Sequence, residues 1–383
     1  MKTEKKFYDF AFVLGGLPYI SYPTGGDNVV FQLCKGLKSN GYSVGLIVIK
    51  NPLSYLSGKN FDKKLKVDGL KDSMLRKILF NRLSYKIGSG ILLKRVGVDY
   101  DFSILDGIDI FFFRSPNKIT KIGIKRIIAT HWSTAKFTSD YINTHNSTVG
   151  YYLVQNREDD PAFSGKLNRY AANTYNLKTL RKIVINKDTY KIFENENPLL
   201  FNVGIDCHIF TYKPNLKEKL IMFPLRKNES KGAKYVLESV EELHNTLQDW
   251  KFSAFGNYSE PIPQYIDFHY RAKTSDLITL YAKSKIFILP SLVEGFPLTV
   301  LEAMSSGCSV VSTNCGGVDE YGIDGENILF VPIKDSKSIT KVVLNLIENE
   351  QLLNGLSAKG AITAEKYSYD NMCKEFISLF KES

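Results

Sequence analysis

The stretch that decides the fold class reads YDFAFVLGGLPYISYPTGGDNVVFQLCKGLKSNGYSVGLIVI (residues 8–49). Residues 8–14 form an apolar run that is typical of a buried strand, and residues 15–26 form a loop rich in glycine. Residues 27–39 carry apolar side chains at helical spacing, and Gly41 ends this helix. Residues 42–49 form a second apolar run. The order strand, loop, helix, strand predicts a βαβ unit, which begins a parallel sheet.

The same alternation continues along the chain of 383 residues. We expect further strands at 110–113, 126–130, 151–154, 182–185, 220–225, 251–255, 265–269, 286–289, 309–312 and 328–331. Turn-forming residues between 195 and 206 interrupt this rhythm, and we place a domain boundary there. The sequence therefore predicts two doubly wound α/β domains, 1–198 and 199–365, and a last helix within 366–383 that packs back on the first domain. Ligands of such folds bind outside the carboxyl ends of the strands.

The charge balance is basic, with 50 Lys and Arg against 40 Asp and Glu, a formal net charge of +10. Between Lys59 and Arg95 there are 11 basic and 3 acidic residues, so 11 − 3 = +8 of the excess lies in this one segment. Apolar residues at helical spacing between Leu70 and Leu83 are typical of a basic amphipathic helix, which either binds an anionic membrane or packs in the first domain. Zinc-finger, RNP and basic-zipper patterns are missing from the sequence, so a nucleic-acid partner is not expected.

The five cysteines are odd in number, widely spaced and free of CxxC pairs, which favours reduced thiols and a cytoplasmic protein. The apolar run that ends at Gly15-Gly16 is too short for a signal-peptide core. The sequence has no apolar stretch near the roughly 20 residues needed to span a bilayer. We therefore expect a cytoplasmic protein, with peripheral attachment to the cytoplasmic membrane face through residues 59–95 left open.

The densest group of candidate functional residues begins at Leu289 and reads LPSLVEGFPLTVLEAM (residues 289–304), followed by SGC at 306–308 and NCGG at 314–317. Pro297 is placed where a helix begins, a position that tolerates its missing N–H. The free amides at this helix start favour a phosphate group. Glu294 before the helix and Glu302 within it are placed to contact one ligand at different depths. In isolation they would be an ordinary loop acid and a helix-surface acid.

These motifs resemble the retaining GT-B glycosyltransferases of family GT4, the glycosyl transferases group 1, in which E-x7-E lies in the same context. The resemblance covers nearly the whole chain and is most specific from Glu294 to Gly317. It implies the GT-B fold, in which two Rossmann-like domains face each other across a cleft. It also implies that Glu294 binds hydroxyls of the donor sugar and that Glu302 binds the ribose of the nucleotide.

Arg226 and Lys231, which follow the first strand of the second domain, match the element that binds the donor diphosphate in this family. Two cations at a strand end suit a departing nucleoside diphosphate, because its leaving oxygen gains negative charge in the transition state. The alternative is that Arg226 and Lys231 are ordinary surface cations that do not bind the diphosphate. Further donor-binding residues are implied by position in the family motifs: Gly25, Gly26, Gly256, Tyr270, Gly295, Phe296, Pro297, Leu298, Thr299 and Glu302.

His131, at the end of the strand predicted at 126–130, matches the histidine that many family members place near the donor sugar. We therefore count Arg226, Lys231, Glu294 and His131 as candidate catalytic residues, although a lone histidine is more often structural. The family usually has a glutamate soon after its glycine pair, whereas this chain has Asp27-Asn28 after Gly25-Gly26. The segment 151–158 is similar to a subgroup that contains bacterial rhamnosyltransferases.

The predicted function is transfer of a sugar from a nucleotide-sugar donor to a hydroxyl of a glycan or lipid-linked acceptor, with retention of configuration, in cell-surface polysaccharide or glycoconjugate synthesis. No cofactor or metal is expected, because cations and a helix start replace the metal in GT-B chemistry. Asp99-Tyr100-Asp101 spells the metal motif of GT-A enzymes but follows no long buried strand. Two alternatives remain: a non-catalytic sugar-nucleotide-binding or scaffold subunit, and another GT-B enzyme such as a phosphorylase or an epimerase.

Overall fold

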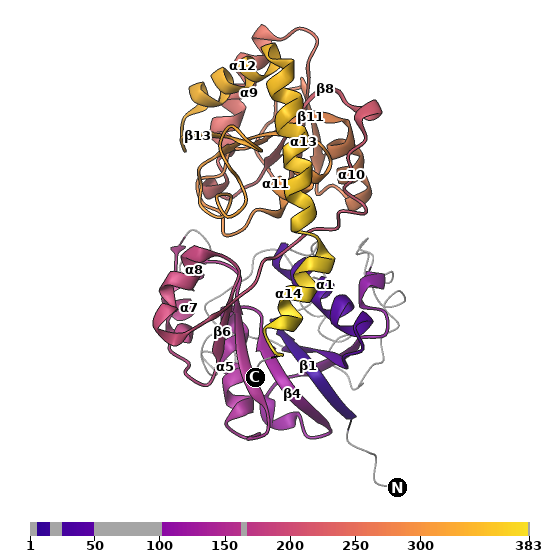
Figure 1. The fold of residues 1–383 in the computed structure, drawn as a ribbon. Helices are drawn as coiled ribbons and strands as arrows, with labels where there is room; N and C mark the ends of the chain where they lie inside the picture. The colour runs from indigo at the N-terminus through magenta and orange to yellow at the C-terminus, as the bar shows by residue number, and fades with distance from the viewer. Residues whose placement is uncertain (1–5, 16–24, 50–101, 162–166, 382–383) are drawn as a thin grey trace, which may run out of the picture. The chain divides into compact units, whose positions relative to one another are not determined.

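The computed structural model describes residues 6–15, 25–49, 102–161 and 167–381 (Figure 1). These residues form two compact units. Unit 1 contains the described residues up to Val184 together with Ile192–Leu200. Unit 2 contains Ile185–Lys191 and the described residues from Phe201 onward. The domain limits that we predict from the sequence, and the packing of 366–383 on the first domain, stay predictions.

Unit 1 is built on a parallel sheet whose seven described strands have the order β3-β2-β1-β4-β5-β6-β7. The strands are β1 (Lys6–Leu14), β2 (Val44–Ile49), β3 (Asp109–Phe113), β4 (Ile122–Ala129), β5 (Val149–Val154), β6 (Arg181–Val184) and β7 (Leu199–Leu200). Strand β1 lies inside the sheet and pairs with β2 on one side and β4 on the other. The first six strands thus follow the order 3-2-1-4-5-6 of a doubly wound fold.

Helices cover both faces of this sheet. They are α1 (Gly25–Ser39), α5 (Trp132–Ile142) and α7 (Asn168–Tyr175). Helix α8 (Lys187–Ile192), which follows β6, lies almost entirely in the chain range of unit 2. On one face Phe137 and Tyr141 of α5 pack against Val13 of β1 and Ile127 of β4. Phe12, whose side chain points to the other side of β1, is also fully buried. A parallel sheet that is buried on both faces explains why its strands read as continuous apolar runs.

Unit 2 repeats this topology with six described strands in the order β10-β9-β8-β11-β12-β13. The strands are β8 (Glu218–Leu225), β9 (Lys251–Gly256), β10 (Ile266–Tyr270), β11 (Ser284–Leu289), β12 (Ser309–Thr313) and β13 (Leu329–Val331). Counted from β8, this is again 3-2-1-4-5-6. The central strands β8 and β11 are direct neighbours, although β9 and β10 lie between them in the sequence.

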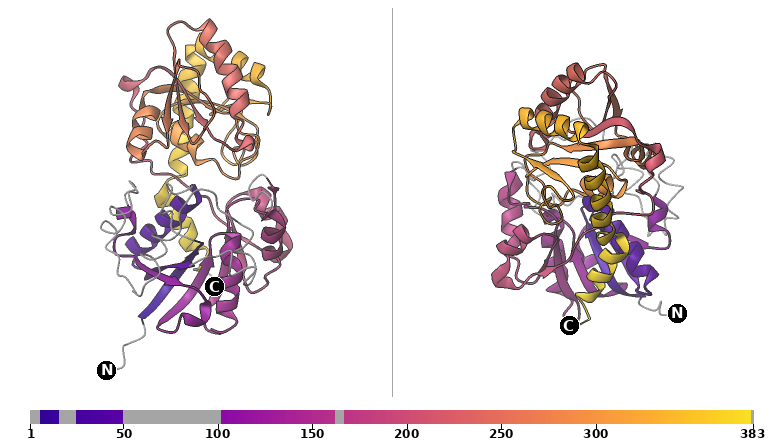
Figure 2. Two further views of the ribbon diagram at one scale, coloured as in Figure 1. Left: turned by 180° about the vertical axis from the view of Figure 1, so that it is seen from behind. Right: turned by 45° about the horizontal axis from the view of Figure 1, so that its top comes forward.

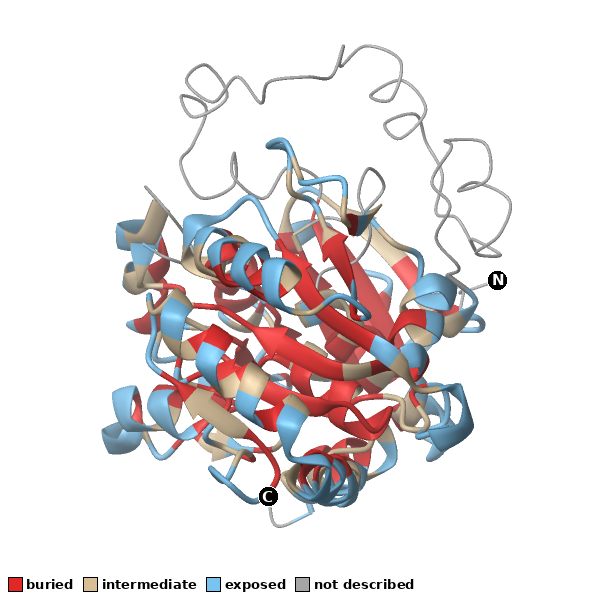
Figure 3. Cartoon of the chain, turned by 90° about the horizontal axis from the view of Figure 1, so that it is seen from above, coloured by how far each residue is buried: buried red, intermediate tan, exposed pale blue. Residues whose placement is uncertain are grey.

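The helices of unit 2 form a layer on each side of its sheet (Figures 1 and 2). They are α9 (Ala233–Thr246), α10 (Thr274–Lys283), α11 (Leu298–Ser305), α12 (Ser336–Glu348) and α13 (Glu350–Lys366). Helix α14 (Tyr369–Ser378) follows α13 and is not part of these layers. Val236 of α9 and Val343 of α12 join one core with Ile221 and Phe223 of β8. Met304 of α11 lies close to Gly360 of α13. Figure 3 shows that buried residues follow the strands and that exposed residues follow the outer sides of the helices.

The prediction of two doubly wound parallel sheets is confirmed, and every predicted strand is present with limits that differ by a few residues. Strand β4 begins at Ile122, four residues before the predicted start. Gly123 and Lys125 interrupt the apolar pattern there and concealed the first half of the strand. Strand β7 was missed because it has only two residues, Leu199–Leu200, and follows a run of turn formers.

Candidate active site

Both sheets reverse their strand order at the same place, between β1 and β4 in unit 1 and between β8 and β11 in unit 2. Loops that follow the two strands at such a switch point diverge to opposite faces of the sheet, which opens a crevice at the carboxyl edge. The predicted site residues Arg226 and Glu294 follow β8 and β11, and His131 follows β4. Each unit therefore presents candidate residues at its own switch point.

The loop after β8 is held tightly against the loop after β11. The Asn228 side chain accepts a hydrogen bond from the Ser230 amide at 3.0 Å and begins a short 3-10 turn at Glu229–Lys231. Gly232 then adopts φ +68°, and a Cβ at this position would lie 1.9 Å from the carbonyl oxygen of Pro290. The Leu292 amide donates to the Ser230 carbonyl oxygen at 2.7 Å. Only glycine allows this close approach at position 232.

This contact places Lys231 beside Glu294. Lys231 Nζ lies 2.9 Å from Glu294 Oε2, and both side chains are less than one fifth exposed. The ammonium group also donates to the Val293 carbonyl oxygen at 3.3 Å, and Ser291 Oγ donates to Glu294 Oε1 at 2.7 Å. A compact cation and a carboxylate are thus fixed side by side, which suits a ligand that carries both phosphate and hydroxyl groups.

Glu302 lies five positions into α11 and is partly buried. Tyr281 of α10, whose side chain is fully buried, donates its hydroxyl to Glu302 Oε2 at 3.0 Å. Burial raises the pKa of Glu302 to about 7, against the opposing effects of the Tyr281 hydrogen bond and the nearby positive charge of Arg226. Arg226 itself is exposed directly after β8. Unit 2 thus pairs Lys231 with Glu294 and places Arg226 near Glu302, with both pairs following the strands of its switch point.

The turn between β11 and α11 is anchored by aromatic packing. The Phe296 ring is 8% exposed and lies 5.2 Å from the ring of Tyr321, centroid to centroid. Tyr321 donates its hydroxyl to the Pro297 carbonyl oxygen at 2.9 Å, and Pro297 is the N-cap of α11, as the sequence predicts. Because the Phe296 ring is packed in this way, only the backbone of Phe296 can contact a nucleotide-sugar donor. Leu298 and Thr299 supply the first amides of the helix.

Two neighbouring segments hold the same turn. The Glu294 amide donates to the Cys315 carbonyl oxygen at 2.9 Å. Gly317 has φ +52°, and a Cβ there would lie 2.3 Å from the Gly295 carbonyl oxygen. Asn186, which is buried, donates its amide to that same oxygen at 2.6 Å. Gly317 is therefore required for the close packing of this segment against the turn.

The two remaining donor-site predictions in unit 2 lie at the ends of β9 and β10. Gly256 has φ +147°, and a Cβ there would lie 1.9 Å from the Leu225 carbonyl oxygen, so this position requires glycine. The Tyr270 side chain is 56% exposed, and the Arg271 guanidinium lies 5.3 Å from the centre of its ring. Both residues lie at the carboxyl edge of the sheet, where we expect the nucleobase of the donor to bind.

In unit 1, the predicted glycine pair begins α1 rather than lying in a loop. A Cβ on Gly26 would lie 3.1 to 3.3 Å from the amide group of Gln155, the residue after β5. Gln155 also donates to the Thr130 carbonyl oxygen at 3.3 Å, and Thr130 Oγ1 donates to the Val13 carbonyl oxygen at 2.8 Å. Polar groups from the ends of β1, β4 and β5 therefore meet at this switch point.

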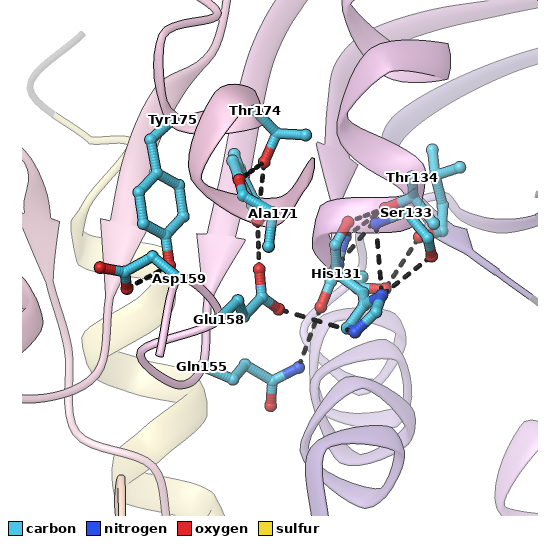
Figure 4. A network of polar contacts seen from close by, with 12 residues as sticks. His131, Ser133, Thr134, Gln155, Glu158, Asp159, Ala171, Thr174 and Tyr175 are labelled. Carbon is cyan, nitrogen blue, oxygen red and sulfur yellow. Dashed lines mark hydrogen bonds and ion pairs between the residues drawn. The ribbon is translucent and has the colours of Figure 1, made fainter. Parts of the chain in front are cut away.

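His131 is the N-cap of α5, and its side chain is 49% exposed. The Ser133 amide donates to His131 Nδ1 at 3.3 Å, and the Ser133 hydroxyl lies 2.8 Å from the same nitrogen (Figure 4). On its other side, His131 Nε2 lies 4.0 Å from Glu158 Oε1. The Glu158 carboxyl is 5% exposed and accepts a hydrogen bond from the hydroxyl of Tyr152.

Sequence reasoning missed Tyr281, Ser291, Gln155 and Glu158 as members of these clusters. Gln155 and Glu158 lie in the segment 151–158, which we had used only as a family likeness. Tyr281 carries no local signal, because it meets Glu302 only through the packing of α10 on α11. The basic segment 59–95 and Asp99-Tyr100-Asp101 lie outside the described residues.

Among the described residues, the helices include none that is long and apolar enough to cross a membrane. The same part of the chain holds no cluster of three or more His, Cys, Asp or Glu side chains arranged to bind a metal ion.

Residues 206–362 match the family model described as glycosyl transferases group 1. An uncharacterized glycosyltransferase of Haemophilus influenzae is 24% identical and aligns with 92% of this chain and 95% of its own length. The N,N'-diacetylbacillosaminyl-diphospho-undecaprenol alpha-1,3-N-acetylgalactosaminyltransferase of Campylobacter jejuni is also 24% identical, over 76% of this chain and 73% of its own.

Among solved structures, Anabaena Alr3699/HepE in complex with UDP-glucose is similar to this chain, with a TM-score of 0.69 and 12% identity. The alignment covers 98% of this chain and all of that chain. At this level of identity the likeness shows the fold, which is the GT-B arrangement of two parallel α/β sheets.

Proposed function

We propose that this chain, a group 1 glycosyltransferase of the GT-B fold that takes sugars from nucleotide-sugar donors, transfers its sugar with retention of configuration to a hydroxyl of a glycan or lipid-linked acceptor. The observation that carries the proposal is the cluster at the switch point of unit 2. There, Lys231 and Glu294 form a 2.9 Å ion pair, and Arg226 lies close enough to Glu302 to lower its pKa.

The cations serve the leaving group. When the bond between the sugar carbon and the diphosphate oxygen breaks, negative charge grows on that oxygen. Lys231, Arg226 and the first amides of α11 stabilise this charge. Glu294 holds the ammonium group of Lys231 in place through the 2.9 Å ion pair. The diphosphate then competes with Glu294 for the ammonium group.

The carboxylates serve the hydroxyl groups of the donor. Glu294 is held by Ser291 and Lys231 in one orientation and accepts hydrogen bonds from the transferred sugar. Glu302 accepts hydrogen bonds from the ribose, and Tyr281 fixes the carboxyl from behind. Bidentate acceptance of neighbouring hydroxyls requires the ionised carboxylate, which has acceptor sites on both oxygens.

Retention follows from substitution on one face. The acceptor oxygen bonds to the sugar carbon on the side from which the diphosphate leaves, and its proton passes to the departing phosphate oxygen. The sequence offers no carboxylate with the character of a nucleophile for the opposite face. We propose that no metal takes part, because the two cations and the helix start supply the positive charge that a metal would supply.

The Campylobacter relative is named for a diphospho-undecaprenol substrate. This supports a lipid-linked acceptor for the present chain, and with it a cytoplasmic protein that works at the membrane surface. Segment 59–95 is our proposed membrane contact on the grounds of its charge alone. A rhamnosyl donor, suggested by the subgroup likeness of 151–158, is one member of the donor panel below.

The test is release of nucleoside diphosphate from a panel of nucleotide sugars, with and without undecaprenyl-diphosphate-linked sugars and in the presence of EDTA. We expect turnover of one donor, unaffected by EDTA, and a product with the anomeric configuration of the donor by NMR. An inverted product would contradict retention. Turnover of a sugar phosphate without nucleotide would favour a phosphorylase, and binding without any turnover would favour a scaffold subunit.

A further inference from the structure

The cluster around Glu158 in unit 1 is not used by the mechanism above (Figure 4). Glu158 follows β5, and its carboxyl group is 5% exposed. Tyr152 of β5, which is fully buried, donates its hydroxyl to Glu158 Oε2. Thr174 of α7 lies behind this tyrosine and donates to its oxygen at 3.4 Å. The carboxyl group is therefore held from the interior of the unit.

The imidazole of His131 faces the same carboxyl group in a defined tautomer. A backbone N–H can only donate, so the bond from the Ser133 amide makes His131 Nδ1 an acceptor. The proton of the neutral ring is then on Nε2. This Nε2–H is the side of the ring that lies 4.0 Å from Glu158 Oε1.

A separation of 4.0 Å is too long for a direct hydrogen bond. It is the separation at which one oxygen atom can lie about 2.8 Å from both groups. A hydroxyl group fits this position because it accepts one hydrogen bond and donates another. A ligand reaches the pair from the His131 side, since that imidazole is half exposed while Glu158 is covered.

We propose that His131 and Glu158 together bind one hydroxyl group of a sugar substrate, with the imidazole donating a hydrogen bond to the hydroxyl oxygen and a carboxyl oxygen of Glu158 accepting the hydrogen bond that this hydroxyl donates. The proposal rests on the proposed function, since it names substrate contacts for that reaction. It adds Glu158 as a binding residue and gives His131 a partner. The hydroxyl belongs either to the donor sugar or to the acceptor, and the experiment separates these sources.

The charge state of the pair supports a neutral ligand group. Burial raises the pKa of Glu158 to about 8, the negative charge of Asp159 raises it further, and hydrogen bonds from Tyr152 and from the backbone of α5 lower it. The other titratable groups that face the carboxyl are His131 and Tyr175 of α7. Within the described residues, no lysine or arginine forms an ion pair with Glu158. An uncharged carboxyl beside a neutral imidazole suits a hydroxyl and disfavours a phosphate.

The experiment compares Glu158→Ala and Glu158→Gln with the wild type. The control variant is Glu194→Gln, which replaces an exposed glutamate elsewhere in unit 1. Three quantities are measured: donor hydrolysis without acceptor, transfer to acceptor, and affinity for the bare nucleoside diphosphate. Glu158→Ala is expected to lower kcat/KM for one sugar substrate by about tenfold to a hundredfold. Glu158→Gln keeps an acceptor oxygen and is expected to remain within about threefold. Nucleoside diphosphate affinity should not change.

Monodeoxy substrates distinguish a binding role from a structural one. The wild type should lose activity toward one deoxy analogue, and Glu158→Ala should no longer distinguish that analogue from the parent sugar. A loss in donor hydrolysis assigns the hydroxyl to the donor, and a loss confined to transfer assigns it to the acceptor. Full activity of Glu158→Ala, or an equal loss with the parent sugar and every analogue, overturns the proposal. A wild type that turns over no nucleotide sugar overturns instead the proposed function.

Discussion

Each of the two units holds one glutamate against a buried tyrosine hydroxyl, yet the charges around the two glutamates differ. In unit 2, Glu302 accepts from Tyr281, and the positive charge of Arg226 lies nearby. In unit 1, Glu158 accepts from Tyr152, and the nearby charge is the negative one of Asp159. Burial raises the pKa of Glu302 to about 7 and that of Glu158 to about 8.

This difference shows how one topology can hold two kinds of site. The strand order and the Glu–Tyr contact are shared, and burial is the main cause that raises both pKa values. The neighbouring charges act in opposite directions: Arg226 lowers the pKa of Glu302, and Asp159 raises that of Glu158. In unit 2 the cations Arg226 and Lys231 suit a diphosphate. In unit 1 the pair formed by His131 and Glu158 is uncharged near neutral pH, which suits hydroxyl groups. The predictions below test this contrast between the units.

The largest effect is expected from Lys231→Ala, which removes the cation of unit 2 that pairs with Glu294 at 2.9 Å. A preorganised charge that stabilises a leaving group contributes about 3 kcal/mol, so kcat for transfer should fall by about a hundredfold. Lys234→Ala, which removes an exposed lysine of α9, is the matched control. Near wild-type kcat in Lys231→Ala, measured at saturating donor, would remove Lys231 from the mechanism.

Gly232→Ala tests the backbone contact that positions Lys231. The new Cβ would lie 1.9 Å from the Pro290 carbonyl oxygen, and the residue has φ +68°. The substitution should lower the free energy of unfolding of unit 2 by roughly 2–3 kcal/mol and lower kcat as well. Denaturant unfolding measures the first effect. Gly355→Ala in α13, where a Cβ meets nothing within 4 Å, is the control and should not destabilise.

Much of this site was predictable because its residues lie in short local motifs. Arg226, Lys231, Glu294 and Glu302 all follow strands that the apolar runs identify, so the topology brings their loops together at the switch point. Tyr281 was not predictable, because its contact with Glu302 depends on how α10 packs on α11.

Glu158 was hidden for a related reason. It is six residues from Tyr152 in the sequence, but its burial depends on α7, which begins ten residues later at Asn168. A loop glutamate is normally exposed, and nothing in its neighbours Arg157 and Asp159 signals a covered carboxyl. The sequence thus locates residues that serve through local motifs and misses those whose role comes from tertiary burial.

A smaller effect is expected from the pH dependence of donor affinity. Glu302 has a pKa of about 7 and must be ionised to accept two ribose hydroxyls, so affinity should rise as pH increases through 7. Below that pH, binding requires loss of a proton, which weakens affinity by up to about tenfold per pH unit. Calorimetric titration of nucleoside diphosphate at pH 6, 7 and 8 measures the trend.

Two variants check the assignment of this pH dependence. Glu302→Gln should bind nucleoside diphosphate weakly, and its affinity should not change between pH 6 and 8. Tyr281→Phe removes a hydrogen bond that lowers the pKa of Glu302, so the midpoint should move to higher pH. A wild-type affinity that is constant from pH 6 to 8 would show that Glu302 does not control ribose binding.

The smallest expected effect is on stability and comes from Glu158. Its pKa in the folded protein, about 8, is higher than the ordinary value of 4.5, so between these limits the folded state binds more protons than the unfolded state. The stabilising contribution of protonated Glu158 is full below pH 4.5 and is lost as pH rises to about 8.

Glu158→Gln cannot titrate, so its Tm should fall less between pH 5 and 8 than the wild-type Tm does. The two slopes should differ by a few degrees per pH unit, because one differing proton corresponds to about 1 kcal/mol per pH unit. Part of the slope should persist, because Glu302 also has a raised pKa and loses stability up to pH 7. Glu194→Gln should keep the wild-type slope, and an identical slope in Glu158→Gln would mean that the carboxyl of unit 1 is already ionised and that the contrast between the units is wrong.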